Sequence, residues 1–189
     1  MKILLTGANG YIGKRLLPAL LSQGHTVYCA VRDKKRFDFK VSENRNIRVI
    51  ELDLLDTKSL EKIPSDIQAA YYLVHSMSNN EDYQSTEQNC AINCVEALNK
   101  TSVKQIIYLS EIANESNLSK HLTSRINVEN ILNSGNYHLT TFRAGIIVGS
   151  GSASFEIIRD LVEKLPLMIT PKWLNTVSQP IAISDVIQF

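Results

Sequence analysis

The sequence predicts a three-layer α/β/α architecture around a doubly wound parallel sheet. Two observations carry this prediction. Short apolar, β-rich runs alternate with amphipathic stretches along the 189 residues, and a glycine-rich turn joins the first run to the first amphipathic stretch. Strands that alternate with helices form βαβ units, whose strands are parallel. Because such crossovers are right-handed, the helices come to cover both faces of the sheet.

Six strands are expected, each as a short apolar run. They cover residues 2–5, 26–32, 47–52, 69–75 and 104–110, with a sixth strand inside 137–148. The run 69–75 is almost continuously apolar, which is typical of a strand buried on both faces. The alternation of these runs with helical segments places all six in one parallel sheet.

Helices are expected between the strands. Residues 11–22 have apolar side chains at positions 12, 16, 17, 20 and 21, which is a helical period, and Gly24 closes this helix. Further helices are expected at 81–100, 118–134 and 154–164. Asn117 is the expected N-cap of the third helix, and Gly135 follows its end. Residues 180–189 predict a strand that runs into a new helix, so we expect one domain over 1–189, truncated before a C-terminal region.

Composition excludes several classes of function. The hydrophobic fraction is 44%, the charged fraction 21% and the formal net charge +1, so neither a nucleic acid nor a membrane surface is an expected partner. No run reaches the roughly 18 apolar residues of a membrane span, and no signal peptide is visible, so a cytoplasmic location is expected. Cys29, Cys90 and Cys94 are expected to be buried free thiols rather than metal ligands.

The turn after the first strand has the spacing of a phosphate-binding loop. Gly7 permits the tight turn, Gly10 allows the backbone to approach a pyrophosphate, and Gly13 lets the helix pack closely on the strand. The helix that follows directs its free N–H groups at the phosphates. The predicted cofactor contacts of this loop are Thr6, Gly7, Asn9, Gly10, Tyr11, Ile12 and Gly13.

The end of the second strand carries the residues that distinguish NADP(H) from NAD(H). Arg32 can clamp a 2′-phosphate, with further positive charge from residues 34–36, whereas Asp33 can accept a hydrogen bond from a ribose 2′-hydroxyl. A charge-assisted contact to phosphate contributes about 1.5–3 kcal/mol. The expected cofactor is NADP(H), with NAD(H) as the alternative. After the third strand, Asp53 can accept from the adenine amino group while Leu54 packs near the ring; the alternative is that Asp53 caps the next helix.

The N-terminal pattern TGxxGxxG resembles extended and atypical short-chain dehydrogenases/reductases, including NmrA-like proteins and relatives of the nucleotide-sugar epimerases. The resemblance covers essentially the whole chain and implies a Rossmann fold that binds a dinucleotide. It also implies cofactor contacts by Val74 and His75 after the fourth strand and by Arg143 at the end of the sixth. Some relatives carry a further C-terminal domain.

The family's proton chemistry depends on a serine and a Tyr-x-x-x-Lys pair, and this chain departs from that pattern. Ser110 occupies the serine position, but no tyrosine has a lysine four residues later. On the expected helix stand His121 and Arg125, four residues apart and therefore on one face. An imidazole can act as acid or base near neutral pH, whereas a guanidinium can hold a ribose or phosphate but does not release its proton.

The sequence therefore leaves three functions open. The first is an oxidoreductase that acts on an unidentified small molecule with Ser110, His121 and Arg125 as its catalytic residues. The second is a protein that senses NAD(P) or serves as a scaffold without catalysis, which the missing tyrosine and lysine favour. The third is a nucleotide-sugar epimerase or dehydratase, which the missing tyrosine and the presence of Arg32 oppose. A homodimer is a further possible assembly.

Overall fold

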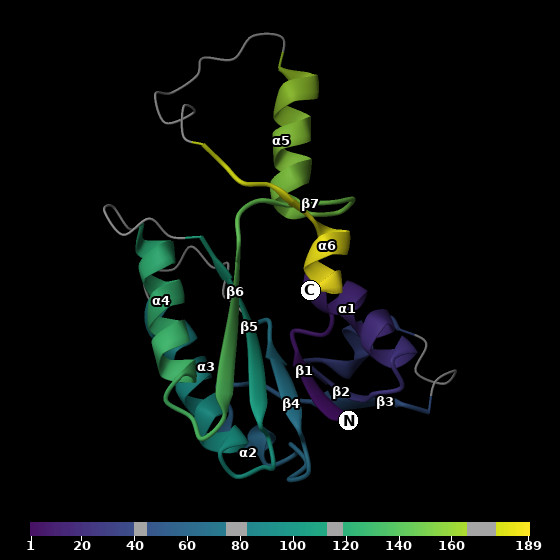
Figure 1. The fold of residues 1–189 in the computed structure, drawn as a ribbon, viewed down its shortest axis with the longest axis vertical. Helices are drawn as coiled ribbons and strands as arrows, with labels where there is room; N and C mark the ends of the chain where they lie inside the picture. Colours follow the sequence, from purple (N-terminus) through teal and green to yellow (C-terminus); the bar gives the residue numbers. More distant parts are fainter. Residues whose placement is uncertain (40–44, 75–82, 113–118, 166–176) are drawn as a thin grey trace. The chain divides into compact units, whose positions relative to one another are not determined.

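The computed structural model describes residues 1–39, 45–74, 83–112, 119–165 and 177–189 (Figure 1). The chain divides into two compact units, Met1–Phe142 and Arg143–Phe189. The first unit holds the sheet and the glycine-rich turn, and the second holds a short strand pair and two helices.

The sheet of the first unit confirms the predicted fold class. It has six strands in the order β3-β2-β1-β4-β5-β6, and the pairings from β3 through β5 are parallel. This order is typical of dinucleotide-binding domains and reverses direction between β1 and β4, where ligands bind in such sheets. The strands are β1 Lys2–Thr6, β2 Thr26–Val31, β3 Ile47–Glu51, β4 Ala69–Tyr72, β5 Gln105–Glu111 and β6 His138–Ala144, whose last two residues belong to the second unit.

The helix α1 Tyr11–Ser22 has the predicted bounds, and α3 Tyr83–Leu98 and α4 Lys120–Leu132 are the next two predicted helices with shifted ends. Two short elements add to the helices that were predicted by residue range, the 3-10 turn η1 Lys34–Arg36 and α2 Thr57–Leu60. The end of α1 is as predicted, since Gly24 has a φ of 77° and donates its N–H to Leu21 O at 2.9 Å. The cap of α4 is Ser119, whose hydroxyl accepts from Leu122 N at 3.3 Å, so α4 begins later than predicted. Asn117, the expected cap, lies outside the described residues.

Side chains that alternate along the strands build a core on each face of the sheet. Leu4, Ala30, Tyr72 and Tyr108 belong to one buried cluster with apolar residues of α3 and α4. The other face is covered by α1, whose Leu17 is fully buried. Figure 1 shows α3 and α4 on one side of the sheet and α1 on the other. The first unit therefore has the three layers that the sequence predicts.

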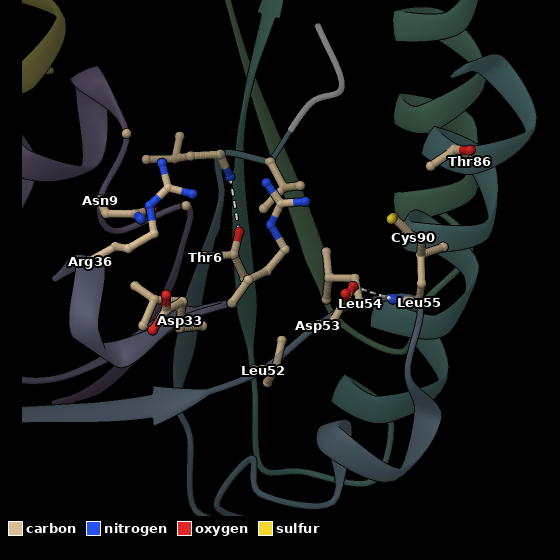
Figure 2. A pocket seen from close by; sticks show the side chains of 17 residues that line it. Thr6, Asn9, Asp33, Arg36, Leu52, Asp53, Leu54, Leu55, Thr86 and Cys90 are labelled. Atoms are coloured by element: carbon tan, nitrogen blue, oxygen red, sulfur yellow. Dashed lines mark hydrogen bonds between the residues drawn. The ribbon is translucent and has the colours of Figure 1, made fainter. Parts of the chain in front are cut away.

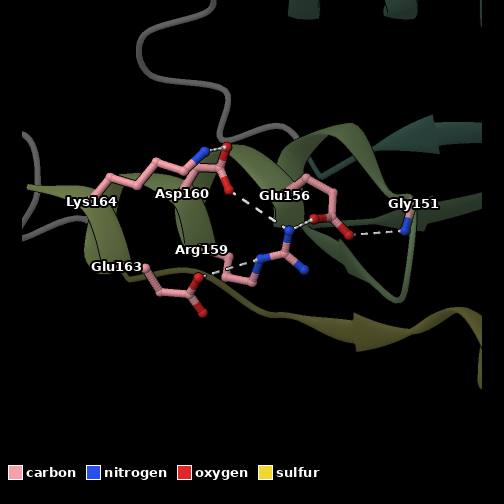
Figure 3. Close-up of polar contacts among 6 residues, drawn as sticks. All are labelled: Gly151, Glu156, Arg159, Asp160, Glu163 and Lys164. Atoms are coloured by element: carbon pink, nitrogen blue, oxygen red, sulfur yellow. Dashed lines mark hydrogen bonds and ion pairs between the residues drawn. The ribbon is translucent and has the colours of Figure 1, made fainter.

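The second unit contains β7 Ile147–Val148, α5 Ala153–Lys164, β8 Ile181–Ala182 and α6 Ile183–Gln188, with β7 and β8 parallel. The strand-to-helix pattern predicted for 180–189 is present as β8 and α6. Charged groups lie along one side of α5, where Arg159 pairs with Glu156, Asp160 and Glu163, and Glu156 accepts from Gly151 N (Figure 3). The loop between β7 and α5 is held further by Ser152, whose hydroxyl donates to Ile147 O at 2.7 Å.

Candidate functional site: a nucleotide-type cavity at the ends of the strands

The glycine-rich turn after β1 is closed by its own backbone. Gly7 has a φ of 65°, and Gly10 N donates to Gly7 O at 2.9 Å. A Cβ on Gly7 would lie 2.9 Å from Leu73 O, and a Cβ on Gly13 would lie 2.4 Å from Gly7 O. Real Cβ atoms do not approach other atoms so closely, so glycine is required at both positions. The turn is therefore a rigid feature between β1 and α1.

Thr6 connects the turn to the neighbouring strand. Its hydroxyl donates to Tyr71 O at 3.0 Å and accepts from Leu73 N at 3.1 Å, and the residue is buried. Because β1 and β4 are the strands between which the sheet order reverses, these two bonds fix the edge of the crevice that opens there. The hydroxyl thus has a structural role in addition to its place on the cavity wall described next.

A cavity of about 350 Å³ opens at the carboxyl ends of β1 to β4, as Figure 2 shows. This is the size range of small-molecule and cofactor sites. Its wall combines backbone of the glycine turn, two arginines, apolar side chains and part of α3. The lining residues are Thr6, Gly7, Asn9, Gly10, Ala30, Val31, Arg32, Asp33, Arg36, Leu52, Asp53, Leu54, Leu55, Leu73, Val74, Thr86 and Cys90.

The structure brings most of the predicted cofactor residues to this one wall. Those that line it are Thr6, Gly7, Asn9, Gly10, Arg32, Asp53, Leu54 and Val74. Tyr11, Ile12 and Gly13 begin α1 and are not among the lining residues; the ring of Tyr11 instead lies under the Arg15 guanidinium, 3.8 Å from its Cζ. Arg143 belongs to the second unit, and His75 lies outside the described residues. The cofactor contacts predicted for these five residues stay predictions.

Two guanidinium groups are the positive charges of the wall. Arg32 directly follows β2, and Arg36 ends the 3-10 turn η1; Figure 2 labels Arg36 among the side chains that line the cavity. Among the described residues, neither arginine forms an ion pair with a carboxylate. Lys34 and Lys35, which share the turn, are not part of the wall. The described part of the wall therefore carries two guanidinium groups, a kind of side chain that can bind a phosphate.

Asp53 adopts a turn of its own after β3. Its Oδ1 accepts from Leu55 N at 3.0 Å, and its backbone N–H donates to Ser59 Oγ at 2.9 Å. The cap of α2 is Asp56, whose Oδ1 accepts from Lys58 N at 3.1 Å. The alternative that Asp53 caps the next helix is therefore wrong. Its side chain lines the cavity, as the adenine role requires, and that role stays a prediction.

The sequence did not indicate the part of the wall that α3 supplies. Thr86 and Cys90 stand one turn apart on α3 and reach the cavity together with Leu55. Burial raises the pKa of the Cys90 thiol to about 11, so the side chain is neutral at physiological pH. In the sequence, Thr86 and Cys90 are four residues apart on an expected helix. This spacing places them on one face of the helix, but it does not indicate which part of the protein that face contacts. All three cysteines are buried free thiols, as predicted.

The predicted catalytic residues lie at the end of β5 and along α4, and none of them belongs to the cavity wall. Ser110 is buried. His121, in the first turn of α4, stacks on Tyr83 of α3 with ring centroids 4.9 Å apart. Arg125, one turn later, lies 3.8 Å from a Glu111 oxygen. The structure therefore gathers the three residues in one region, between β5 and the two helices.

Polar side chains lie near Arg125 and along the contact between α3 and α4. Burial raises the pKa of Tyr108, while the nearby Arg125 and Ser110 side chains act to lower it. On the α3 side, the buried Glu87 carboxylate accepts a hydrogen bond from the fully buried Ser124. This contact and the Tyr83–His121 stack are one helical turn apart on α3. Together they fix how α4 lies along α3, and so where His121 and Arg125 are held.

The part of the chain that the structure describes contains no group of three or more His, Cys, Asp or Glu residues placed to hold a metal ion. In the same residues, no helix combines the length and apolarity needed to span a bilayer.

The chain is similar in sequence to known proteins. A family model described as NAD(P)H-binding matches residues 7–143, which contain the glycine turn, the cavity and α4. Retinol dehydrogenase 12 of Homo sapiens is 36% identical over 84 residues, 41% of this chain and 27% of that protein. An uncharacterized protein of Saccharomyces cerevisiae is 29% identical over 110 residues, 57% of this chain and 37% of its own length. The matches thus span about a third of these relatives.

Solved structures share the fold. The UDP-glucuronic acid 4-epimerase of Bacillus cereus, determined with NAD, superposes with a TM-score of 0.77 at 21% identity, over all of this chain and 71% of the enzyme. The Bordetella bronchiseptica enzyme WbmG, also with NAD, gives 0.78 at 18% identity, over all of this chain and 66% of that protein. These likenesses confirm the Rossmann fold.

Proposed function

The chain belongs to the NAD(P)H-binding family, and from that premise we propose that it is an NADP(H)-dependent oxidoreductase of the atypical short-chain dehydrogenase/reductase class, acting on a small molecule. The observation that carries the proposal is the pair of arginines on the cavity wall. Arg32 and Arg36 line the same cavity as the glycine turn. The diphosphate of the cofactor would lie at the glycine turn, and the 2′-phosphate of its adenosine half would lie at the two arginines.

The residues present fit the adenosine half of such a cofactor. Glycines at positions 7 and 13 leave no room for a Cβ, and Gly10 contributes to the wall with backbone alone. Asp53 supplies a carboxylate beside apolar Leu52, Leu54 and Leu55. An adenine ring would lie among these leucines, while its amino group donates to Asp53. The polar and apolar parts of the wall thus match those of the nucleotide.

Chemistry is assigned to the region between β5 and α4. A bound nicotinamide would supply the hydride. In this reducing direction His121 would donate the accompanying proton from its imidazole to the substrate oxygen, which Ser110 would orient with its hydroxyl; in the reverse direction His121 would accept that proton. Arg125 would fix a ribose or phosphate group, since a guanidinium keeps its proton. The stack on Tyr83 and the Glu87–Ser124 bond hold the helix that carries both residues.

A second function, NADP(H) sensing without catalysis, is favoured by two observations. The Tyr-x-x-x-Lys pair is absent from the sequence, and the three residues assigned to catalysis are not on the cavity wall. The two functions share the cofactor site and differ in whether Ser110, His121 and Arg125 act on a substrate.

Calorimetric titration with NADPH and NADH tests the shared site. We expect tighter binding of NADPH, and we expect Arg32→Ala and Arg36→Ala each to weaken it about ten- to a hundredfold while leaving NADH unchanged. Lys35→Ala is the matched control, because it removes a charge from the same turn but not from the wall. A larger loss with Lys35→Ala than with Arg36→Ala would contradict the assignment.

Turnover separates the two functions. Substrate-dependent oxidation of NADPH that is lost in His121→Ala, with NADPH affinity retained, supports the oxidoreductase. Turnover that is unchanged in His121→Ala contradicts the role given to this residue. If no carbonyl substrate from a broad panel is reduced while NADPH binds tightly, the sensing function takes precedence.

A further inference from the structure

The segment between Arg32 and Arg36 contains an acidic residue, Asp33, whose position in the sequence favours NAD(H) over NADP(H). Asp33 stands where a carboxylate accepts from the ribose 2′-hydroxyl of NAD, and its charge would oppose a 2′-phosphate. In the structure this carboxylate has a different partner. Its Oδ1 accepts from Lys35 N at 2.8 Å, and Asp33 is the N-cap of η1.

This cap begins a short, well-defined turn. Asp33 has extended backbone angles, φ −140° and ψ 114°, and its carbonyl accepts from Arg36 N at 3.2 Å. Phe37 N then donates to Lys34 O at 3.2 Å. Side chains that cap an N–H two residues on are typical of Asp and Asn, and they hold a turn that the backbone alone would hold weakly. The carboxylate therefore sets the direction of the three residues that follow.

The direction of the turn decides which basic side chain meets the cavity. Of the three basic residues of η1, only Arg36 lines the wall, together with Arg32. The far side of the turn is tied to α1 by an ion pair of 2.8 Å between Asp38 and Lys14. Both of these side chains are exposed, so this pair contributes little by itself. The Asp33 cap before the turn is thus the main fixed point for Arg36.

We propose that Asp33 is a positioning residue for NADP(H): by capping η1 it holds Arg36 at the cavity beside Arg32, and so it favours the phosphorylated cofactor that its charge alone would disfavour. The proposal rests on the proposed function, because it presumes that the arginines meet a 2′-phosphate. Figure 2 shows Asp33 and Arg36 as neighbours on the same part of the wall.

The charge of Asp33 and its capping role predict opposite changes in NADPH affinity for the substitution Asp33→Ala. If only charge matters, Asp33→Ala removes a repulsion and NADPH binds more tightly. If the cap matters, Asp33→Ala loosens the turn, and NADPH affinity falls about two- to thirtyfold, the range of a lost helix cap. Affinity for NADH, which has no 2′-phosphate for Arg36 to bind, should fall by less, so the ratio of NADPH to NADH affinity decreases.

Asp33→Asn is the rescuing variant. Asparagine caps as well as aspartate but carries no charge, so NADPH affinity in Asp33→Asn should equal or exceed that of the unchanged protein. A second test uses Arg36→Ala as background. If Asp33 acts through Arg36, adding Asp33→Ala to Arg36→Ala causes no further loss, and the double-mutant cycle shows coupling.

Asp56→Ala is the matched structural control. Asp56 caps α2 by the same bond, Oδ1 to Lys58 N, but it is not part of the cavity wall. It should lower thermal stability about as much as Asp33→Ala and leave the ratio of NADPH to NADH affinity unchanged.

Different results would overturn the positioning role of Asp33 and the NADP(H) assignment. Tighter NADPH binding in Asp33→Ala, a loss in Asp33→Asn as large as in Asp33→Ala, or full additivity with Arg36→Ala each overturns the positioning role alone. A preference of the unchanged protein for NADH overturns the NADP(H) assignment and the inference with it.

Discussion

The cofactor cavity and the α3–α4 interface are built in different ways. The cavity is built on turns that each close within a few residues: Gly7 to Gly10 after β1, Asp33 to Arg36 after β2, and Asp53 to Leu55 after β3. The interface is made by side chains 37 residues apart, such as Glu87 and Ser124. The first region thus depends on local conformation and the second on packing of two helices, so the two should respond differently to substitution.

Substitution of Gly7 should cause the largest loss of stability, and it should disrupt the cavity but not the α3–α4 interface. In Gly7→Ala the new Cβ meets Leu73 O at 2.9 Å in addition to the cost of a positive φ. Gly24→Ala is the matched control, since Gly24 also has a positive φ, of 77°, but nothing within 4 Å of a Cβ. We expect Gly7→Ala to be about 1–3 kcal/mol less stable than Gly24→Ala in denaturant unfolding, with NADPH binding lost only in the former. Equal stability of the two variants would show that the turn relaxes.

Removal of the Ser124 hydroxyl should break the interface and leave the cavity intact. Ser124→Ala takes a hydrogen-bond donor from the buried Glu87 carboxylate, which should lower the free energy of unfolding by about 1–3 kcal/mol. Ser134→Ala, at an exposed hydroxyl near the end of α4, should change it by less than about 0.5 kcal/mol. NADPH affinity should be unchanged in both. A selective loss of NADPH affinity in Ser124→Ala would show that the two regions are coupled.

At neutral pH the buried thiols give the smallest effect, because their contribution to stability changes only at high pH. Burial raises the pKa of Cys90 from 9.0 to about 11, and those of Cys29 and Cys94 to about 12. The unfolded chain therefore loses thiol protons at lower pH than the folded protein. This contribution to stability is fully present below about pH 9, and the free energy of unfolding should decline from pH 9 to 11 as these thiols ionise in the unfolded state. Replacement of all three cysteines by alanine should flatten this decline; an unchanged slope would contradict the assignment.

Alkylation of the same thiols distinguishes the cavity from the core. Cys90 lines the cavity, whereas Cys29 and Cys94 do not. Bound NADPH should therefore slow modification of Cys90 by a small alkylating reagent more than it slows modification of the other two. Equal protection of all three would mean that the reagent reaches them only through global opening.

The contrast between the two regions also explains what the sequence could predict. The glycine spacing 7, 10 and 13, the position of Arg32 after β2 and that of Asp53 after β3 identify the cavity, because each follows a strand whose end is visible in the sequence. Arg36 and Asp33 were visible as charges, but their roles depend on a hydrogen bond from Lys35 N that no pattern specifies. Thr86 and Cys90 reach the cavity only through the packing of α3. The Glu87–Ser124 and Tyr83–His121 contacts likewise require the register of two helices, which spacing along one chain does not give.

The most direct test of the central claim uses fragments of the cofactor. Adenosine 2′,5′-bisphosphate and adenosine 5′-monophosphate differ only in the phosphate that Arg32 and Arg36 are proposed to bind, and neither contains the nicotinamide. We expect calorimetry to show at least about tenfold tighter binding of the bisphosphate, with the difference abolished in the Arg32→Ala/Arg36→Ala double variant. Equal affinity of the unchanged protein for the two fragments would contradict an NADP(H)-selective cavity.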